Sequence, residues 1–306
     1  MFTRDFFMQE VKSPKSIDEQ IAILRKRGCE ISNTGLAREV LSKTNYYRLS
    51  AYFLPFKDPY GTYISGTTFE RVFHIYEFDR KIRTLLFCAI ERIETALRAH
   101  LAYMHGMKYG ALGYRDPENF DFKSDYKFGK LIKSKEEKEK EFQKTINRVI
   151  LNNKNNLFVK HHNENYGGQF PIWVIIELFT FGMLSKFFSH LHTQDKKVIA
   201  RQYHTSYKIL GSWLRCCTDL RNICAHGGRL YYRIFSAAPS GFILQEKVSR
   251  SLWASMLVIK ALYPFPDQWR EDFISQIKGL INKYLNDIDL KHLYFPENWE
   301  EELGNN

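Results

Sequence analysis

One apolar pattern, between residues 68 and 104, constrains the fold more than any other feature of the sequence. Apolar residues recur there at helical spacing and form one stripe, which contains Ile75, Phe78, Ile82, Leu85, Leu86, Ala89, Ile93, Ala96, Leu97 and Leu101. The other face of this helix carries Arg80, Lys81, Arg83, Arg92 and Arg98. A helix with so long an apolar stripe must pack against other helices, which favours an all-α helical bundle.

Shorter helical patterns flank this long one. Ser16 and Glu19 form a capping box ahead of the first pattern, and Gly28 closes it. Further helices are expected at residues 35–44, 171–184, 194–202, 207–226, 248–262 and along the tail from residue 264. No internal repeat or strand-rich region is visible. We expect an N-terminal helical region (1–67), a helical core (68–262) with a lysine-rich insertion near 115–165, and a C-terminal helical tail (263–306).

The charge balance favours a polyanionic partner. The 306 residues include 45 Lys and Arg against 34 Asp and Glu, a net charge of +11. Nucleic acid is the leading partner class and anionic lipid the second. The most apolar stretch, residues 170–188, contains Glu177 and Lys186 and is too short to span a membrane. Residues 1–14 lack the apolar core of a secretory signal, so we expect a cytoplasmic protein.

Cysteine and histidine spacing gives no sign of a metal centre or cofactor. The five cysteines include no CxxC pair and fit a reducing compartment. Two histidine pairs, His161 with His162 and His190 with His192, lack neighbouring ligands at metal-binding spacing. We therefore expect structural or solvent-exposed histidines, with no metal and no cofactor.

Three other features have two possible roles each. The lysine-rich segment at residues 123–160 alternates in charge, which favours a solvated helix over a dedicated nucleic-acid arm. Tyr46, Tyr47 and Arg48 could stack on unpaired bases, although core packing is the preferred role. Glu177, within an apolar helix, is expected to form a buried ion pair rather than to orient a catalytic arginine.

The helix expected at residues 207–226 carries the candidate catalytic residues. On a helical wheel its apolar stripe contains Trp213, Cys216, Cys217, Leu220, Ile223 and Cys224. Arg221, Asn222 and His226 lie off this stripe, with Asn222 angularly between the other two. Gly227 and Gly228 follow at once and indicate the helix end, where the helix dipole favours a protonated imidazole.

These three residue types suit metal-free cleavage of RNA. Histidine can act as general acid or base on the 2′-hydroxyl or the 5′-oxygen, while arginine stabilises charge on the phosphoryl group. The Asn222 amide could hold the imidazole or a ribose hydroxyl. The reaction would leave a 2′,3′-cyclic phosphate and a 5′-hydroxyl, and DNA should be inert because it lacks the 2′-hydroxyl.

One helix supplies a single histidine, whereas concerted acid–base cleavage is helped by two. A homodimer that pairs this face across a two-fold axis would supply both. A weaker alternative is a second site within the chain at Arg98 and His105, where His105 also precedes a glycine.

The segment from Arg221 to His226 matches the R-N-x-x-x-H signature of HEPN domains. The blocks NYYRLSAYFLPF, FDRKIRTLLFCAIERIETALRAHLAY, PIWVIIELFTFGMLSK and LRNICAHGGRLYYR, over residues 44–233, resemble in order the bacterial Abi family, an AbiD/AbiF-like group implicated in abortive infection. This resemblance implies an all-α HEPN-type bundle with N-terminal and C-terminal helical extensions. It also implies catalytic roles for Arg221 and His226, with Asn222 in support, and association with a structured noncoding RNA.

Three hypotheses follow from the sequence. The first is a phage-defence endoribonuclease, for which the intact Arg221, Asn222 and His226 set argues. The second is a protein that binds a structured RNA without cutting it, because some HEPN domains only bind. In either case the expected RNA-binding residues are Arg48, Arg80, Arg92, Arg98, Arg215 and Arg229. The third is a membrane-surface protein. The sequence argues against it, because no helix convincingly combines a basic face with low hydrophobicity.

Overall fold

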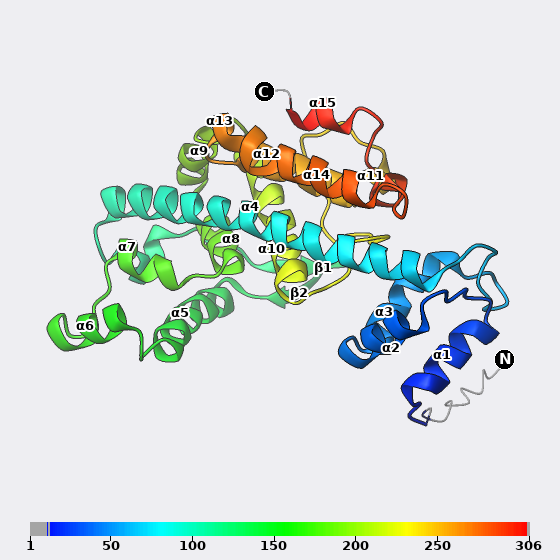
Figure 1. The fold of residues 1–306 in the computed structure, drawn as a ribbon. Coiled ribbons are helices and arrows are strands. Elements are labelled where there is room, and N and C mark those ends of the chain that lie inside the picture. The colour runs from blue at the N-terminus through cyan, green and yellow to red at the C-terminus, as the bar shows by residue number, and fades with distance from the viewer. Residues whose placement is uncertain (1–10, 12, 305–306) are drawn as a thin grey trace, which may run out of the picture. The chain divides into compact units, whose positions relative to one another are not determined.

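The computed structural model describes Val11 and residues 13–304, and their packing forms two compact units. The first unit contains the described residues up to Asp79 together with Lys283–Ile288, and the second contains Arg80–Asn282 and the residues from Asp289 onward. Helices dominate, with one small two-stranded sheet, so the all-α prediction is confirmed (Figure 1). Among the described residues, no helix is long and apolar enough to cross a membrane. The three-part division at residues 67 and 262 stays a prediction.

Local sequence signals define the short helices of the first unit. These helices are α1 (Ile17–Lys26), α2 (Thr34–Lys43), α3 (Tyr46–Phe53) and the 3₁₀ turn η1 (Leu54–Phe56). Ser16 and Glu19 form the predicted capping box at α1, and Gly28 follows it with φ of +89°. Asn33 caps α2 and Asn45 caps α3. In each case the side-chain oxygen accepts a hydrogen bond from a backbone N–H of the helix.

The long helix α4 (Phe69–Tyr109) begins in the first unit and continues in the second. Its apolar stripe is buried as predicted, with Leu85 and Ala96 only half-buried. The helix extends five residues beyond the predicted end at 104, because Gly106 is accommodated within it and Gly110, with φ of +79°, stops it.

The second unit contains the rest of α4 and most of the remaining elements. In chain order these are η2 (Gly113–Arg115), η3 (Pro117–Asn119), β1 (Asp125–Lys127), β2 (Lys130–Lys133), α5 (Lys135–Asn152), α6 (Leu157–Asn165), α7 (Ile172–Ile175), η4 (Ile176–Leu178), α8 (Phe181–His190), α9 (Thr193–Arg201), α10 (Tyr207–Ala225), α11 (Glu246–Ser249), α12 (Leu252–Leu262), α13 (Pro266–Trp269), the π-helical η5 (Arg270–Ile274), α14 (Ser275–Tyr284), η6 (Leu290–Leu293) and α15 (Trp299–Gly304). Only the end of α14 belongs to the first unit.

Two expected helices are each interrupted by a capping residue. Phe179 is extended, and Thr180 then caps α8 by accepting a hydrogen bond from the Met183 N–H, so residues 171–184 do not form one helix. Ser251 separates α11 from α12 in the same way. Both residues are of cap-forming types, but Thr180 lies within an apolar run and Ser251 directly precedes one, so the apolar pattern alone does not reveal either break.

Two side-chain predictions are wrong. Glu177 lies on the short 3₁₀ turn η4 and is exposed, so it forms no buried ion pair. Tyr47 is 85% exposed and Arg48 is also exposed, because α3 buries its other face, with Leu49, Tyr52 and Phe53. Core packing therefore does not explain either residue.

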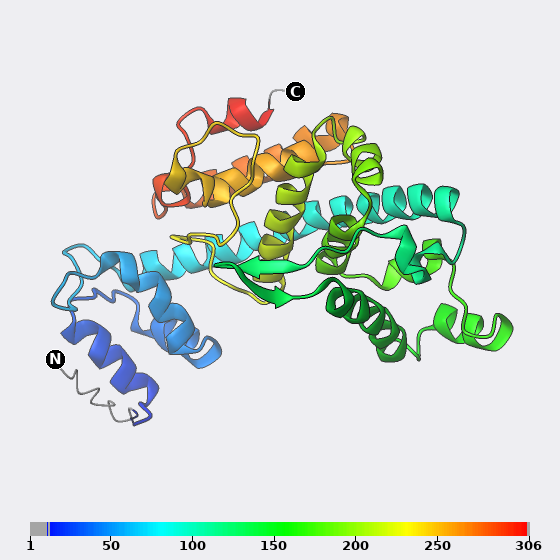
Figure 2. The same ribbon diagram turned by 180° about the vertical axis from the view of Figure 1, so that it is seen from behind.

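A hairpin precedes the lysine-rich helix α5 and was not predicted. Strands β1 and β2 pair in antiparallel fashion around Phe128 and Gly129, both of which have positive φ (Figure 2). Ser134 and Glu137 then form a capping box for α5, and the helix buries Phe142 and Ile146. Asp125 and Lys133 of this hairpin line a pocket together with residues of α5.

His105 belongs to the core. Its ring has no exposed surface and lies 4.8 to 5.3 Å from the ring centroids of Tyr109, Phe120 and Phe187. Burial lowers the pKa of His105 from 6.5 to about 4. A ring without exposed surface cannot contact RNA, so the alternative second site at Arg98 and His105 is excluded.

Burial of a neutral imidazole makes the fold sensitive to acid. Because the folded-state pKa lies below the unfolded value, this contribution is complete above about pH 6.5 and falls as the pH drops toward 4, by up to about 3 kcal/mol. We expect His105→Phe, which keeps a flat ring, to flatten the decline of melting temperature between pH 6.5 and 4. His161→Phe, on exposed α6, is the matched control. An unchanged pH profile in His105→Phe would contradict this assignment.

Candidate active site at the end of helix α10

The predicted helix at residues 207–226 is confirmed as α10. Ser206 caps its start by accepting a hydrogen bond from the Ile209 N–H, and the helix packs against α8, α9 and α12. The predicted stripe is buried through Leu220, whereas Ile223 and Cys224 are only half-buried. Burial raises the pKa of Cys216 to about 12 and that of Cys217 further, so neither thiol is a nucleophile at neutral pH.

The end of α10 has the geometry that its two glycines indicated. The Gly228 N–H donates to the Ile223 carbonyl at 2.8 Å, and the Gly227 N–H donates to the Cys224 carbonyl at 3.2 Å. Gly227 has φ of +63°, so this is a Schellman motif with His226 as the C-cap residue. The His226 side chain is exposed at this end, and its backbone N–H donates to the Asn222 carbonyl.

Helix α4 and η6 hold the turn that follows His226. Arg83 on α4 is 6% exposed, and its guanidinium donates a hydrogen bond to the Gly228 carbonyl at 3.2 Å. Further along the chain, Tyr231 and Tyr232 both contact the His292 ring of η6 through their hydroxyl groups. The sequence pattern does not predict these contacts of Arg83, Tyr231 and Tyr232. It places Arg83 on the basic face of the long helix.

Arg221 points toward α4, where it meets a buried carboxylate. Its Nε lies 3.9 Å from Glu94 Oε2, too far for a hydrogen bond, and its guanidinium lies over the Phe87 ring at 5.6 Å. The Arg221 side chain is 27% exposed and borders a cavity of about 170 Å³, which Arg98 and Glu91 also line. An anion in this cavity could therefore approach the guanidinium.

Glu94 is shared between two arginines. Arg98 Nη2 donates to Glu94 Oε1 at 2.5 Å and also to the Phe179 carbonyl at 2.9 Å. Burial raises the pKa of Glu94, while the charges of Arg98 and Arg221 oppose that rise. Glu94 is not among the predicted site residues, although its spacing of four residues before Arg98 is a recognised ion-pair signal on a helix.

The structure places the predicted site residues at two positions around the helix end. Arg221 lies with Glu94 and Arg98, whereas Asn222 and His226 are exposed to solvent. Among the described residues, no three His, Cys, Asp or Glu side chains are arranged to hold a metal ion.

The predicted RNA-binding arginines differ in their surroundings. Arg48, Arg80 and Arg215 are exposed, and Arg229 is half-buried. Arg92 forms an ion pair with Asp272 at 3.3 Å, and Arg98 forms one with Glu94. The basic face of α4 is therefore less open than the sequence pattern indicated, because partners within the protein occupy part of it.

Removal of Glu94 should destabilise the fold, because Glu94 is the carboxylate that lies between Arg98 and Arg221. We expect Glu94→Ala to lower the free energy of unfolding by about 3 kcal/mol, since the nearly buried Arg98 would lose its counter-charge. Glu94→Gln should cost less because an amide oxygen still accepts the Arg98 hydrogen bond. Urea denaturation measures both. Glu91→Ala, one turn earlier and exposed, is the control, and an equal loss there would argue against a structural role for Glu94.

Comparison with known proteins agrees with the resemblance noted in the sequence. The model of the family described as Abi-like protein matches residues 39–232, which is more than half of the chain and includes α4 and α10. No curated protein and no solved structure matches the chain. The chain therefore belongs to the Abi-like protein family.

Proposed function

We propose that this protein is a cytoplasmic, RNA-binding phage-defence protein that cleaves RNA as a metal-independent endoribonuclease of the HEPN type. Membership of the Abi-like family suggests the role in abortive infection. The observation that carries the proposed activity is the exposed imidazole of His226 at a Schellman-capped helix end, with Arg221 little more than one turn before it.

In the proposed reaction, His226 moves a proton and Arg221 stabilises charge. The imidazole acts as general base or acid on the ribose 2′-hydroxyl or the leaving 5′-oxygen. The guanidinium donates to the phosphoryl oxygens as negative charge builds up on them, and Asn222 holds the imidazole or a ribose hydroxyl. The products are a 2′,3′-cyclic phosphate and a 5′-hydroxyl, and a 2′-deoxy substrate cannot react.

The ion-pair geometry gives Arg221 the freedom that this role requires. Arg98 is hydrogen-bonded to Glu94 at 2.5 Å, whereas Arg221 lies 3.9 Å away. Because Arg98 stays in place, Arg221 can turn toward a phosphate without leaving a buried carboxylate unpaired. A phosphate would then take the position of counter-ion to Arg221.

We further propose that the protein acts as a homodimer around a two-fold axis at this face, and that it associates with a structured noncoding RNA. A second copy would supply a second histidine, which helps concerted acid–base cleavage. It would also cover Asn222 and His226, which are exposed in one chain.

A second candidate function is RNA binding without cleavage. The observation that favours it is the direction of Arg221, which contacts Phe87 and Glu94 on α4. The exposed Arg48, Arg80 and Arg215 could support such binding through phosphate contacts.

Cleavage assays in EDTA distinguish the two functions. We expect His226→Ala to lower the rate of RNA cleavage by roughly 10²–10⁴-fold and Arg221→Ala by roughly 10²–10³-fold. Both variants should keep their fold and their affinity for RNA. His161→Ala, an exposed histidine on α6, is the control. Tight binding by the unaltered protein without any cleavage products would instead support the binding function.

Mixing the unaltered protein with one inactive variant tests the two-fold arrangement. The unaltered protein should have a mass in solution twice the 36.3 kDa of one chain. If both histidines serve one composite site, a mixed dimer of unaltered and His226→Ala subunits keeps a single histidine and should lose most of its activity. After subunit exchange, an equal mixture should then have about a quarter of the activity of the same total amount of unaltered protein, against about half if each subunit acts alone. A monomeric mass, or an activity of about half after verified exchange, would rule out a site shared in this way.

A further inference from the structure

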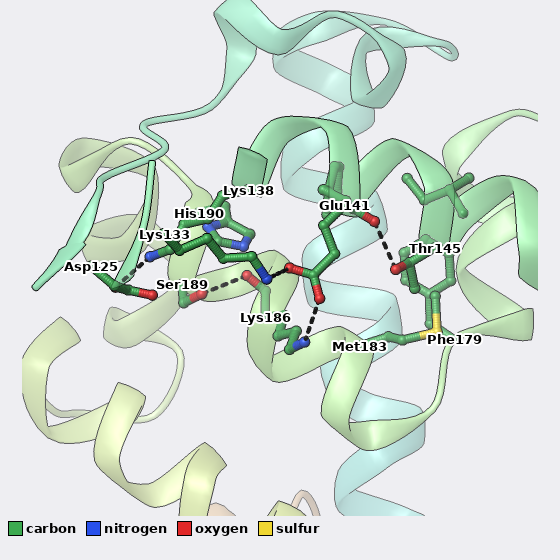
Figure 3. Close-up of a pocket in the computed structure, with 12 residues that line it drawn as sticks. Asp125, Lys133, Lys138, Glu141, Thr145, Phe179, Met183, Lys186, Ser189 and His190 are labelled. Carbon is green, nitrogen blue, oxygen red and sulfur yellow. Dashed lines mark hydrogen bonds and ion pairs between the residues drawn. The ribbon is translucent and has the colours of Figure 1, made fainter. Parts of the chain in front are cut away.

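A second cavity shares no lining residue with the cavity beside Arg221 and has its own charged rim. It has a volume of about 260 Å³ and is enclosed by the β1–β2 hairpin, α5 and α8 (Figure 3). Its floor is apolar and contains Phe142, Ile146, Phe179 and Met183. The volume is slightly below the roughly 300–1,000 Å³ of typical small-molecule pockets, which favours a compact ligand over a nucleic-acid strand.

The rim of this pocket contains three lysines and two carboxylates. Lys138 is 2.6 Å from Asp125, so these two charges satisfy each other. Glu141 lies between Lys133, which it contacts directly, and Lys186 at 4.0 Å (Figure 3). The Lys186 side chain is 70% exposed and is the least engaged cation of the rim. Two ammonium groups thus converge on one carboxylate at the mouth of an apolar pocket.

Uncharged polar groups line the wall between rim and floor. The hydroxyls of Ser189 and Thr145 donate to carbonyl oxygens of their own helices, which leaves their oxygens available as acceptors. Burial lowers the pKa of His190 to about 4, so its imidazole is neutral at pH 7 and can donate or accept one hydrogen bond. Contact with Lys133 lowers the pKa of Glu141, which is therefore a carboxylate at pH 7.

We propose that this pocket binds a nucleoside monophosphate. The phosphate takes the place of the Glu141 carboxylate between Lys133 and Lys186, and the base lies on the apolar floor. Glu141 is about half exposed and can turn into water when a phosphate replaces it, so its displacement carries little desolvation cost. The neutral polar groups of the wall suit a ribose and the edge of a base, whereas a lipid chain would leave them without partners.

The ligand could be a free nucleotide or the 5′-terminal nucleotide of an RNA, since both present the same chemistry. Neither source depends on cleavage at Arg221 and His226, so binding can be measured whatever the outcome of the cleavage assays.

Calorimetric titration of the full chain with AMP, GMP, CMP and UMP tests the proposal. At least one nucleotide should bind, and it should bind at least about tenfold more tightly than its nucleoside or inorganic phosphate. Lys186→Glu should weaken this binding by about tenfold or more, because it places a negative charge beside the phosphate. Glu141→Gln should strengthen it, because it removes the competing anion. Opposite effects from two residues of one rim are not expected from a general loss of fold.

Lys144→Glu makes the same charge change on α5, at an exposed position outside the pocket, and should leave the affinity unchanged. A 5′-phosphorylated RNA trinucleotide and its 5′-hydroxyl counterpart distinguish the two ligand sources. Tighter binding of the phosphorylated trinucleotide than of any mononucleotide supports the RNA end, and the reverse supports the free nucleotide. Absence of binding by every nucleotide and trinucleotide, or equal effects of Lys186→Glu and Lys144→Glu, would overturn the proposal.

Discussion

The candidate active site depends on one stripe of helix α4 that meets the end of α10. Arg83, Phe87, Glu94 and Arg98 are spaced by four, seven and four residues, which places them within about 60° of one another on a helix. Arg83 binds the Gly228 carbonyl, while Phe87 and Glu94 contact Arg221. A single rigid helix therefore fixes both the turn after His226 and the position of the guanidinium. A shift of α10 along α4 would disturb both at once.

The local part of this arrangement could be predicted from the sequence. The capping box at Ser16 and Glu19 and the helix end at Gly227 and Gly228 depend on hydrogen bonds within a few residues, so their patterns are visible in the chain. The breaks at Thr180 and Ser251 depend on the same physics, but Thr180 lies within an apolar run and Ser251 directly precedes one, so neither break is visible in the apolar pattern. The hairpin at Phe128 and Gly129 was missed because its strands are short and exposed.

What the sequence could not provide is the partner of each polar side chain. Periodicity places Arg83 and Arg92 on the flanks of the apolar stripe and Arg98 nearly opposite it, positions from which charged side chains ordinarily reach water. In the structure all three bind groups that are distant in the sequence. His105 shows the same limit. It precedes a glycine, as His226 does, but its ring lies in the aromatic core and not at the surface. Only tertiary packing separates these two histidines.

Two carboxylates in this protein are each placed between two cations, and the difference in burial determines what an anion can do there. Glu94 is buried and hydrogen-bonded to Arg98, so a phosphate can recruit only the more distant Arg221 and must leave the carboxylate in place. Glu141 is about half exposed, so a phosphate can displace it and use both Lys133 and Lys186. The first arrangement provides one guanidinium whose Nε has no hydrogen bond to the carboxylate, which suits the transient contact with a reacting phosphodiester that we propose. The second provides two cations around one anion position, which suits stable binding of a phosphate.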